Sequence, residues 1–162
     1  MILSHKLRLA GMALLLLSAS SYAGWPAVTP FTAMAGSWSG GGTLTMASGM
    51  QEPLRCRAQY GVISDRNDLQ LNIRCASPSY NFDLAGRAEY QDGVISGSWS
   101  EATRNASGTI SGRASGNHIQ VAARGNSFSA SLSLMTRGRY QTVEIQPQGT
   151  DVTNVSIALN RR

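Results

Sequence analysis

The fold of this chain is decided by residues 55–75, which read RCRAQYGVISDRNDLQLNIRC. The midpoint between Cys56 and Cys75 falls within SDRND, a run of residues that favours a turn. A hairpin folded about that midpoint places Cys56 opposite Cys75 and gathers the large apolar side chains on the cysteine face. The other face carries the polar residues Arg55, Arg57, Gln59, Gln70, Asn72 and Arg74. Because cysteine spacing and period-2 alternation select the same register, the sequence predicts this hairpin.

A second hairpin is predicted around Asp92-Gly93, a pair of residues that suits a type I′ turn. In the resulting register Gly86 faces Trp99, and Leu84 faces Glu101. The indole of Trp99 is therefore predicted to cover the space that Gly86 leaves empty.

Two glycine–asparagine pairs predict the next registers. A turn at Gly116-Asn117 pairs Ile110 with Ala123. A turn at Gly125-Asn126 is predicted to pair Ala123 with Phe128. Both turns give the strand between them the same inward face, and this agreement supports sequential antiparallel pairing.

Three further strands are predicted over residues 36–46, 139–146 and 152–159, where apolar residues alternate with polar ones. No segment after residue 23 has a helical period. The sequence thus predicts an all-β domain over residues 36–162, an antiparallel meander of about eight to ten strands with one hairpin disulfide. Such a meander hides its edges best by closing into a barrel or a rolled sandwich.

Residues 1–23 have the features of a secretory signal peptide. Lys6 and Arg8 precede a short apolar run over residues 9–17, and small residues precede the cleavage site expected before Gly24. The alternative, a membrane anchor, would need a longer apolar run. We therefore expect a periplasmic or secreted protein, with residues 24–35 forming an extended segment before the barrel.

Export bears on the two cysteines, because exported compartments are oxidising. We expect a Cys56–Cys75 disulfide, with two buried thiols as the alternative. The chain has 14 basic and 9 acidic residues, and the arginines are scattered along it. This distribution is not typical of nucleic-acid binding.

Motifs for catalysis are missing from the sequence. It holds no nucleophile elbow or phosphate loop, and His118 is the only histidine outside the predicted signal peptide. One histidine and a bridged pair of cysteines are too few ligands for zinc. We therefore expect a protein without catalytic residues, metal or cofactor.

The inward face is rich in aromatic and small residues, which predicts a binding site for a small apolar or amphipathic ligand. Its candidate ligand-binding residues are Trp38, Tyr60, Phe82, Trp99 and Glu101. Glu101 lies on an apolar face two positions from Trp99, where its pKa could be raised so that it serves as an acid or a ligand anchor. The alternative is that Glu101 lies at the barrel mouth, in water or paired with an arginine.

The polar face offers a candidate anion patch formed by Arg55, Arg57 and Arg74, since Arg57 faces Arg74 across the hairpin. Like charges in that position repel. Either acidic residues on the next strand, Asp83 and Glu89, relieve the repulsion, or the arginines hold an anion.

Residues 31–40, which read FTAMAGSWSG, resemble the first-strand Gly-x-Trp of calycins, the group that includes lipocalins, fatty-acid-binding proteins and avidins. The resemblance implies that a basic residue near the end of the chain, here Arg161 or Arg162, packs across Trp38. The chain is also similar to periplasmic metalloprotease inhibitors, which are small exported barrels with an early Gly-x-Trp and one disulfide. More broadly it resembles small exported β-proteins of Gram-negative bacteria. The calycins and the inhibitors imply binding, not catalysis.

Four functional alternatives remain open from the sequence, the last of them an enzyme, for which no recognisable catalytic set is present. The first is a ligand-binding barrel, and the second is an inhibitor or protein-interaction module that uses residues 24–30. The third is a small outer-membrane barrel, because alternation alone does not say which face lies inside. The sequence does not predict an oligomeric state.

Overall fold

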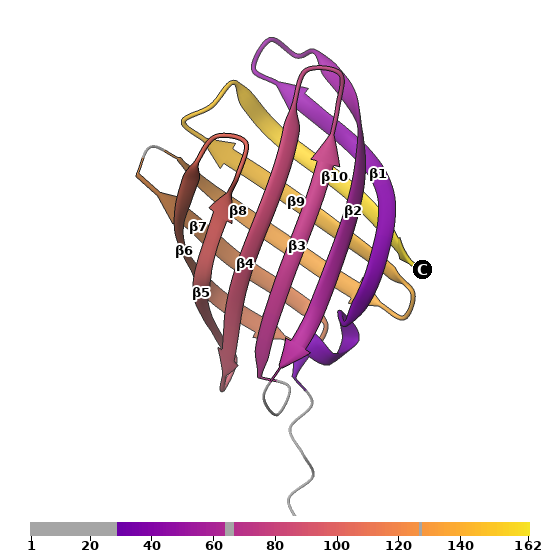
Figure 1. Cartoon of the computed structure of the whole chain (residues 1–162), viewed down its shortest axis with the longest axis vertical. Helices are drawn as coiled ribbons and strands as arrows, with labels where there is room; N and C mark the ends of the chain where they lie inside the picture. The colour runs from indigo at the N-terminus through magenta and orange to yellow at the C-terminus, as the bar shows by residue number, and fades with distance from the viewer. Residues whose placement is uncertain (1–28, 64–66, 127) are drawn as a thin grey trace, which may run out of the picture.

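Ten antiparallel strands follow one another around a closed barrel (Figure 1). This computed structural model describes residues 29–63, 67–126 and 128–162. The strands are β1 (Gly36–Met46), β2 (Gln51–Ile63), β3 (Asp68–Ala76), β4 (Asn81–Gln91), β5 (Val94–Glu101), β6 (Ala106–Ser115), β7 (His118–Gly125), β8 (Ser129–Arg137), β9 (Tyr140–Gln148) and β10 (Val152–Arg161). Each strand pairs with the next, and β10 pairs with β1, so the predicted all-β barrel is confirmed.

The hairpin between β2 and β3 has the predicted register. Cys56 lies opposite Cys75 and the two form a disulfide, while Arg57 lies opposite Arg74. The hairpin between β4 and β5 is also confirmed, with Gly86 opposite Trp99. Its turn residues Asp92 and Gly93 both have a positive φ, as a type I′ turn requires.

The register predicted for the turn at Gly125-Asn126 is wrong by two residues. Ala123 lies opposite Ala130, whereas the sequence predicts Phe128 there. The connection is longer than two residues, because the backbone N–H of Gly125 donates to the carbonyl of Phe128 and β8 begins at Ser129. A shift of two residues keeps each side chain on its face, so the predicted inward face of β7 is retained.

The space above Gly86 is filled differently from the prediction. The side chain nearest to its missing Cβ is that of Leu71 on β3, which pairs with Gly86. The indole of Trp99 instead reaches across β6 toward Gly125 on β7. Strand pairing fixed which residues face each other, but the direction of each side chain was set by its rotamer.

A single turn of 3-10 helix, η1 (Pro30–Ala33), precedes β1 at one end of the barrel (Figure 1). The sequence predicts an extended segment over residues 24–35, so this turn is a correction. Phe31 and Met34 are buried in the core, and the Phe31 ring meets the edge of Tyr90. Burial of these apolar side chains stabilises η1 against the barrel, whereas an extended segment would leave them in water. We call this end the closed end and the opposite one the rim.

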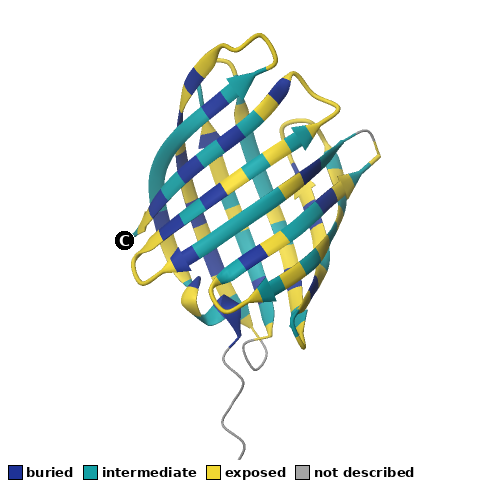
Figure 2. Cartoon of the chain, turned by 180° about the vertical axis from the view of Figure 1, so that it is seen from behind, coloured by how far each residue is buried: buried dark blue, intermediate teal, exposed yellow. Residues whose placement is uncertain are grey.

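The apolar face of the strands is the inner face. Buried and exposed residues alternate along the strands (Figure 2). The large apolar side chains exposed in the described part of the chain lie at strand ends or in turns: Met50, Ile63, Val94 and Tyr140. This polar outer wall is the reverse of the lipid-facing wall that the outer-membrane alternative requires.

Within the described ranges, no helix is long and apolar enough to cross a membrane. The predicted signal peptide and its cleavage site before Gly24 lie outside the described residues, as does most of the 24–30 segment. At the end of that segment, Thr29 and Pro30 are buried.

Candidate functional site

Small residues occupy many inward positions of the five strands β4 to β8, between large ones such as Ile95, Trp99 and Ile119. The small ones are Gly86, Ala88, Gly97, Gly108, Gly112, Ala114, Ala123 and Ala130. At Gly108 a Cβ would collide with the backbone carbonyl of Arg124, so the close approach of β6 and β7 requires glycine there. Since small side chains occupy little volume, we call this side of the barrel the less filled half.

The exposure of inward side chains also differs between the two parts of the barrel. Most inward side chains of β1, β2 and β10 are almost completely buried, as Leu44, Leu54 and Leu159 illustrate. On β3 to β9 some inward apolar side chains are buried as well, such as Leu69 and Ile95. Others keep accessible surface although they point into a closed barrel: Leu71, Ile73, Ile110, Val121, Leu134 and Ile145. The less filled half therefore presents an apolar, accessible inner surface.

Trp99 is buried beside this surface, near the rim. Its indole approaches Gly125, and its ring meets the edge of the Phe128 ring with centroids 5.8 Å apart. The side chain is 6% exposed, and its Nε1 atom is buried with no acceptor among the described residues. A buried N–H without an acceptor is unfavourable, and a bound molecule with a suitable oxygen would satisfy it.

Glu101 occupies the predicted inward position but has a different role. Its carboxylate accepts hydrogen bonds from the backbone N–H of Asp83 at 2.9 Å, the backbone N–H and hydroxyl of Thr103, and the backbone N–H of Arg104 at 2.9 Å. Burial alone raises the pKa of this carboxyl, but these hydrogen bonds together lower the pKa below its ordinary value. The raised pKa is not found. Glu101 instead follows the alternative: it lies at the rim with Arg104 at 3.7 Å, and it holds the β5–β6 turn together.

Glu52 holds the β3–β4 turn together in the same way, a role that was not predicted from the sequence. It is buried at the rim end of β2, where it accepts hydrogen bonds from the Ser77 hydroxyl at 2.6 Å and the Ser79 N–H at 3.1 Å. The Ser77 bond in particular lowers the pKa of Glu52. One feature of the sequence could have indicated this role: Glu52 lies opposite Leu44, and alternation along β2 places it on the inward face.

Phe82 lies at the rim with an aromatic neighbour and a cation. Its ring stacks with that of Tyr80, and the Arg104 guanidinium lies over Phe82, 5.0 Å from the ring centroid. Arg104 comes from the β5–β6 turn and also contacts Glu101, at 3.7 Å. Because the turn brings Arg104 to Phe82 across strands, no local sequence pattern indicated it.

Trp38 and Tyr60 are far from the rim, in the packed closed end. The Trp38 Nε1 donates to the Met34 carbonyl at 2.7 Å, and the Arg161 guanidinium lies 4.7 Å from the indole centroid. This is the contact that the resemblance to calycins implies, and Arg161 supplies it.

Tyr60 donates its hydroxyl proton to Gln141 Oε1 at 2.9 Å, and burial raises its pKa. Gln141 is completely buried and in turn donates to the Thr136 hydroxyl at 3.0 Å. Tyr60 and Trp38 are thus satisfied within the protein, and the structure separates them from Phe82, Trp99 and Glu101.

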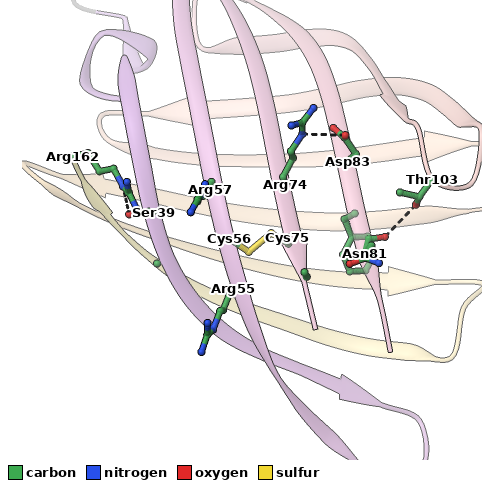
Figure 3. A pocket seen from close by; sticks show the side chains of 13 residues that line it. Ser39, Arg55, Cys56, Arg57, Arg74, Cys75, Asn81, Asp83, Thr103 and Arg162 are labelled. Atoms are coloured by element: carbon green, nitrogen blue, oxygen red, sulfur yellow. Dashed lines mark hydrogen bonds and ion pairs between the residues drawn. A yellow bond between two sulfur atoms is a disulfide. The ribbon is translucent and has the colours of Figure 1, made fainter. Parts of the chain in front are cut away.

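The predicted arginine patch lies on the outer wall, on the other side of the same strands (Figure 3). Arg74 forms an ion pair with Asp83 at 3.1 Å, so one of the two predicted acidic partners is confirmed. Glu89, the other, lies opposite Asp68 and Ser96 instead. Arg162 joins the patch by donating from Nε to the Ser39 hydroxyl at 2.7 Å, a contact that required the closure of β10 on β1.

No protein-family model and no curated protein sequence matches this chain. Among solved structures it is similar to Rv2717c from M. tuberculosis, with 11% identity and a TM-score of 0.64 over 83% of this chain and 98% of that one. It is also similar to the S-type phycobiliprotein lyase CPES from Guillardia theta, with 10% identity and a TM-score of 0.56 over 82% of this chain and 89% of that one. The shared feature is the barrel fold.

Proposed function

We propose that this protein is an exported barrel that binds a small apolar or amphipathic ligand in the less filled half of its interior, without catalysing a reaction on it. The observation that carries the proposal is the accessible apolar inner surface formed by β3 to β9, with Val121 and Ile145 among its side chains. Apolar surface that remains accessible inside a closed wall gains free energy when an apolar ligand covers it.

The rim is the end through which such a ligand enters. Phe31 and Met34 fill the closed end, whereas the rim carries the partly accessible rings of Tyr80 and Phe82. A ligand that passes them reaches Trp99, whose buried Nε1 lacks an acceptor among the described residues. This favours an amphipathic ligand with a hydrogen-bond acceptor.

Two further observations support the proposal. A protein named as a phycobiliprotein lyase shares the fold, which agrees with a barrel that handles a small ligand or a protein partner. Glu101, the carboxylate nearest to Trp99 in sequence, already accepts hydrogen bonds from Asp83 and from the β5–β6 turn. Because this carboxylate is occupied, a binding function is favoured over acid–base chemistry. For export, support comes from residues 1–23 and from the Cys56–Cys75 disulfide.

A neutral fluorescent probe, N-phenyl-1-naphthylamine, tests the interior site without engaging the arginines outside. We expect saturable binding of one probe per chain, accompanied by a change in tryptophan fluorescence. Val121→Phe places a larger side chain on the accessible inner surface and should lower probe affinity at least about tenfold, since it removes apolar area from the site.

The matched control is Gln120→Phe, one residue earlier on the same strand and exposed on the outer wall. Equal affinities for the wild type and Val121→Phe would overturn the proposal, as would the absence of saturable binding. Ile145→Phe on β9 serves as a second filling variant if Val121→Phe does not fold. Native mass spectrometry of the protein isolated from its own host then identifies a retained ligand.

A further inference from the structure

A row of charged and polar side chains crosses the outer wall of β1 to β4 (Figure 3). Ser39 lies opposite Arg57, Arg57 opposite Arg74, and Arg74 opposite Asp83. Arg162 extends the row at the β1 side through its hydrogen bond to Ser39. Four strands and the end of the chain thus contribute to one continuous outer feature, which we call the arginine row.

A hollow of about 730 Å³ lies against the arginine row. The neighbouring cross-strand row, one step toward the rim, consists of Gly41, Arg55, Ala76 and Asn81. Because Gly41 and Ala76 flank Arg55 with almost no side chain, the wall is recessed on both sides of this arginine. Arg55 and Arg57, two positions apart on one face of β2, are therefore separated by about 7 Å along the strand, with open space beside them.

Positive charge in this hollow exceeds negative charge. Arg74 is paired with Asp83, but Arg55, Arg57 and Arg162 form no ion pair within the described residues. Arg57 also lies directly opposite Arg74, an arrangement of like charges that costs stability. An anion between the guanidinium groups would reverse the sign of that interaction.

A basic lining is not shared by a second hollow on the outer wall. A second hollow, of about 390 Å³, lies over β6 to β9 and is lined chiefly by serine, glutamine and alanine, with Glu144 as its one charged residue. A recess between outward side chains in this barrel therefore does not require a basic lining.

We propose that the hollow beside the arginine row binds a phosphate group, carried either by a soluble compound or by an anionic phospholipid headgroup. Guanidinium groups match phosphate oxygens with pairs of parallel hydrogen bonds, and Arg55 and Arg57 present two such groups to the same space. The Ser39 hydroxyl and Arg162 complete the β1 side. This site lies on the outer wall, so it does not depend on the interior site proposed above.

Calorimetric titration of the full mature protein with inorganic phosphate tests the proposal at low ionic strength. We expect binding that weakens as sodium chloride is added, because exposed charges are screened. The variant Arg55→Gln/Arg57→Gln should lose at least about tenfold in affinity, since each loses a charge-assisted hydrogen bond.

The matched control is Arg87→Gln/Arg113→Gln, which removes the same charge from exposed positions on β4 and β6, outside the hollow. Equal loss in both double variants would overturn the proposal, because net charge alone would then explain the binding. Urea unfolding curves that match the wild type show that each variant is folded.

Vesicles distinguish the two sources of the phosphate group. Sedimentation with vesicles of phosphatidylglycerol in phosphatidylcholine, but not with phosphatidylcholine alone, assigns the site to a headgroup if Arg55→Gln/Arg57→Gln abolishes it. Binding of inorganic phosphate without vesicle binding assigns it to a soluble compound. Binding of neither ligand overturns the proposal.

Discussion

Arg161 lies across the indole of Trp38, with its Cζ atom 4.7 Å from the ring centroid. The two residues are also directly opposite each other in the pairing of β1 with β10. Arg161 donates a further hydrogen bond to the carbonyl of Ala33 in η1, and Trp38 donates to Met34. The seam between β1 and β10, which closes the barrel, and η1 at its closed end are thus both held by this pair of side chains.

This seam makes a first prediction about stability. Trp38→Ala should lower the free energy of unfolding by about 3–5 kcal/mol, because it empties a buried site. Arg161→Ala should lower it by about 1–2 kcal/mol through loss of the cation–π contact and the charged hydrogen bond. Urea unfolding measures both, and Arg113→Ala, on the outer wall of β6, should change little. A Trp38→Ala variant as stable as the wild type would contradict the burial of this ring.

The disulfide gives a second prediction. Cys56 and Cys75 are 19 positions apart and are bonded across β2 and β3. Cys56→Ala/Cys75→Ala should therefore lower the free energy of unfolding by about 3 kcal/mol, mainly because the unfolded chain gains freedom. Non-reducing peptide mapping of native protein produced in an oxidising compartment checks the bond. Two thiols that alkylate freely in that protein would contradict it.

Acid should destabilise the rim through Glu101. Its folded pKa lies below the ordinary value of 4.5, so its charged form contributes stability that is fully present above about pH 4.5. That contribution is lost as the pH falls through the folded pKa. Glu101→Gln should cost about 1–3 kcal/mol at neutral pH, because an amide N–H₂ then faces backbone donors.

Urea unfolding at a series of pH values tests this prediction. The wild type should lose more stability than Glu101→Gln between pH 5 and pH 3, so that the two curves converge in acid. Parallel curves would show that the carboxylate of Glu101 contributes nothing in its ionised form. Glu144→Gln is a suitable control, because Glu144 lies exposed on the outer wall of β9.

Two substitutions of Trp99 distinguish its contribution to stability from its contribution to ligand binding. Trp99→Ala should cost about 3–5 kcal/mol, as a large buried side chain is removed. Trp99→Phe should cost less than half of that, since it keeps a ring and removes the buried N–H that lacks an acceptor. If the ligand uses that N–H, Trp99→Phe should still weaken binding of a probe with an acceptor oxygen, while leaving a hydrocarbon probe unaffected. Equal effects on the two probes would exclude the hydrogen bond.

Strand registers were predictable wherever a short turn and period-2 alternation agreed. The pairings of Cys56 with Cys75 and of Gly86 with Trp99 illustrate this. At Gly125 the prediction missed by two residues, because a Gly-Asn pair does not by itself fix the length of the connection. The inward and outward faces of the strands were still predicted correctly, because a shift by two residues preserves the alternation.

Roles of site residues were less predictable. Glu101 was placed on the inward face, but the lowering of its pKa depends on N–H groups from the β4 strand and its own turn. Arg104 and Arg162 were missed as partners of Phe82 and Ser39, because each contact joins residues far apart in sequence or on a turn of unknown path.

The sequence by itself determined the local properties of this protein: its strands, most of their registers, the disulfide and the division of each strand into an apolar and a polar face. These follow from the alternation of side chains and from turn chemistry, which act over a few residues. Only the tertiary structure decided that the apolar face lies inside, that β10 closes on β1, and which inward side chains keep accessible surface, such as Val121 and Ile145. It also gathered the arginine row and its hollow on the outer wall. These features depend on the curvature of ten strands and on contacts such as Trp38 with Arg161, which no local pattern specifies.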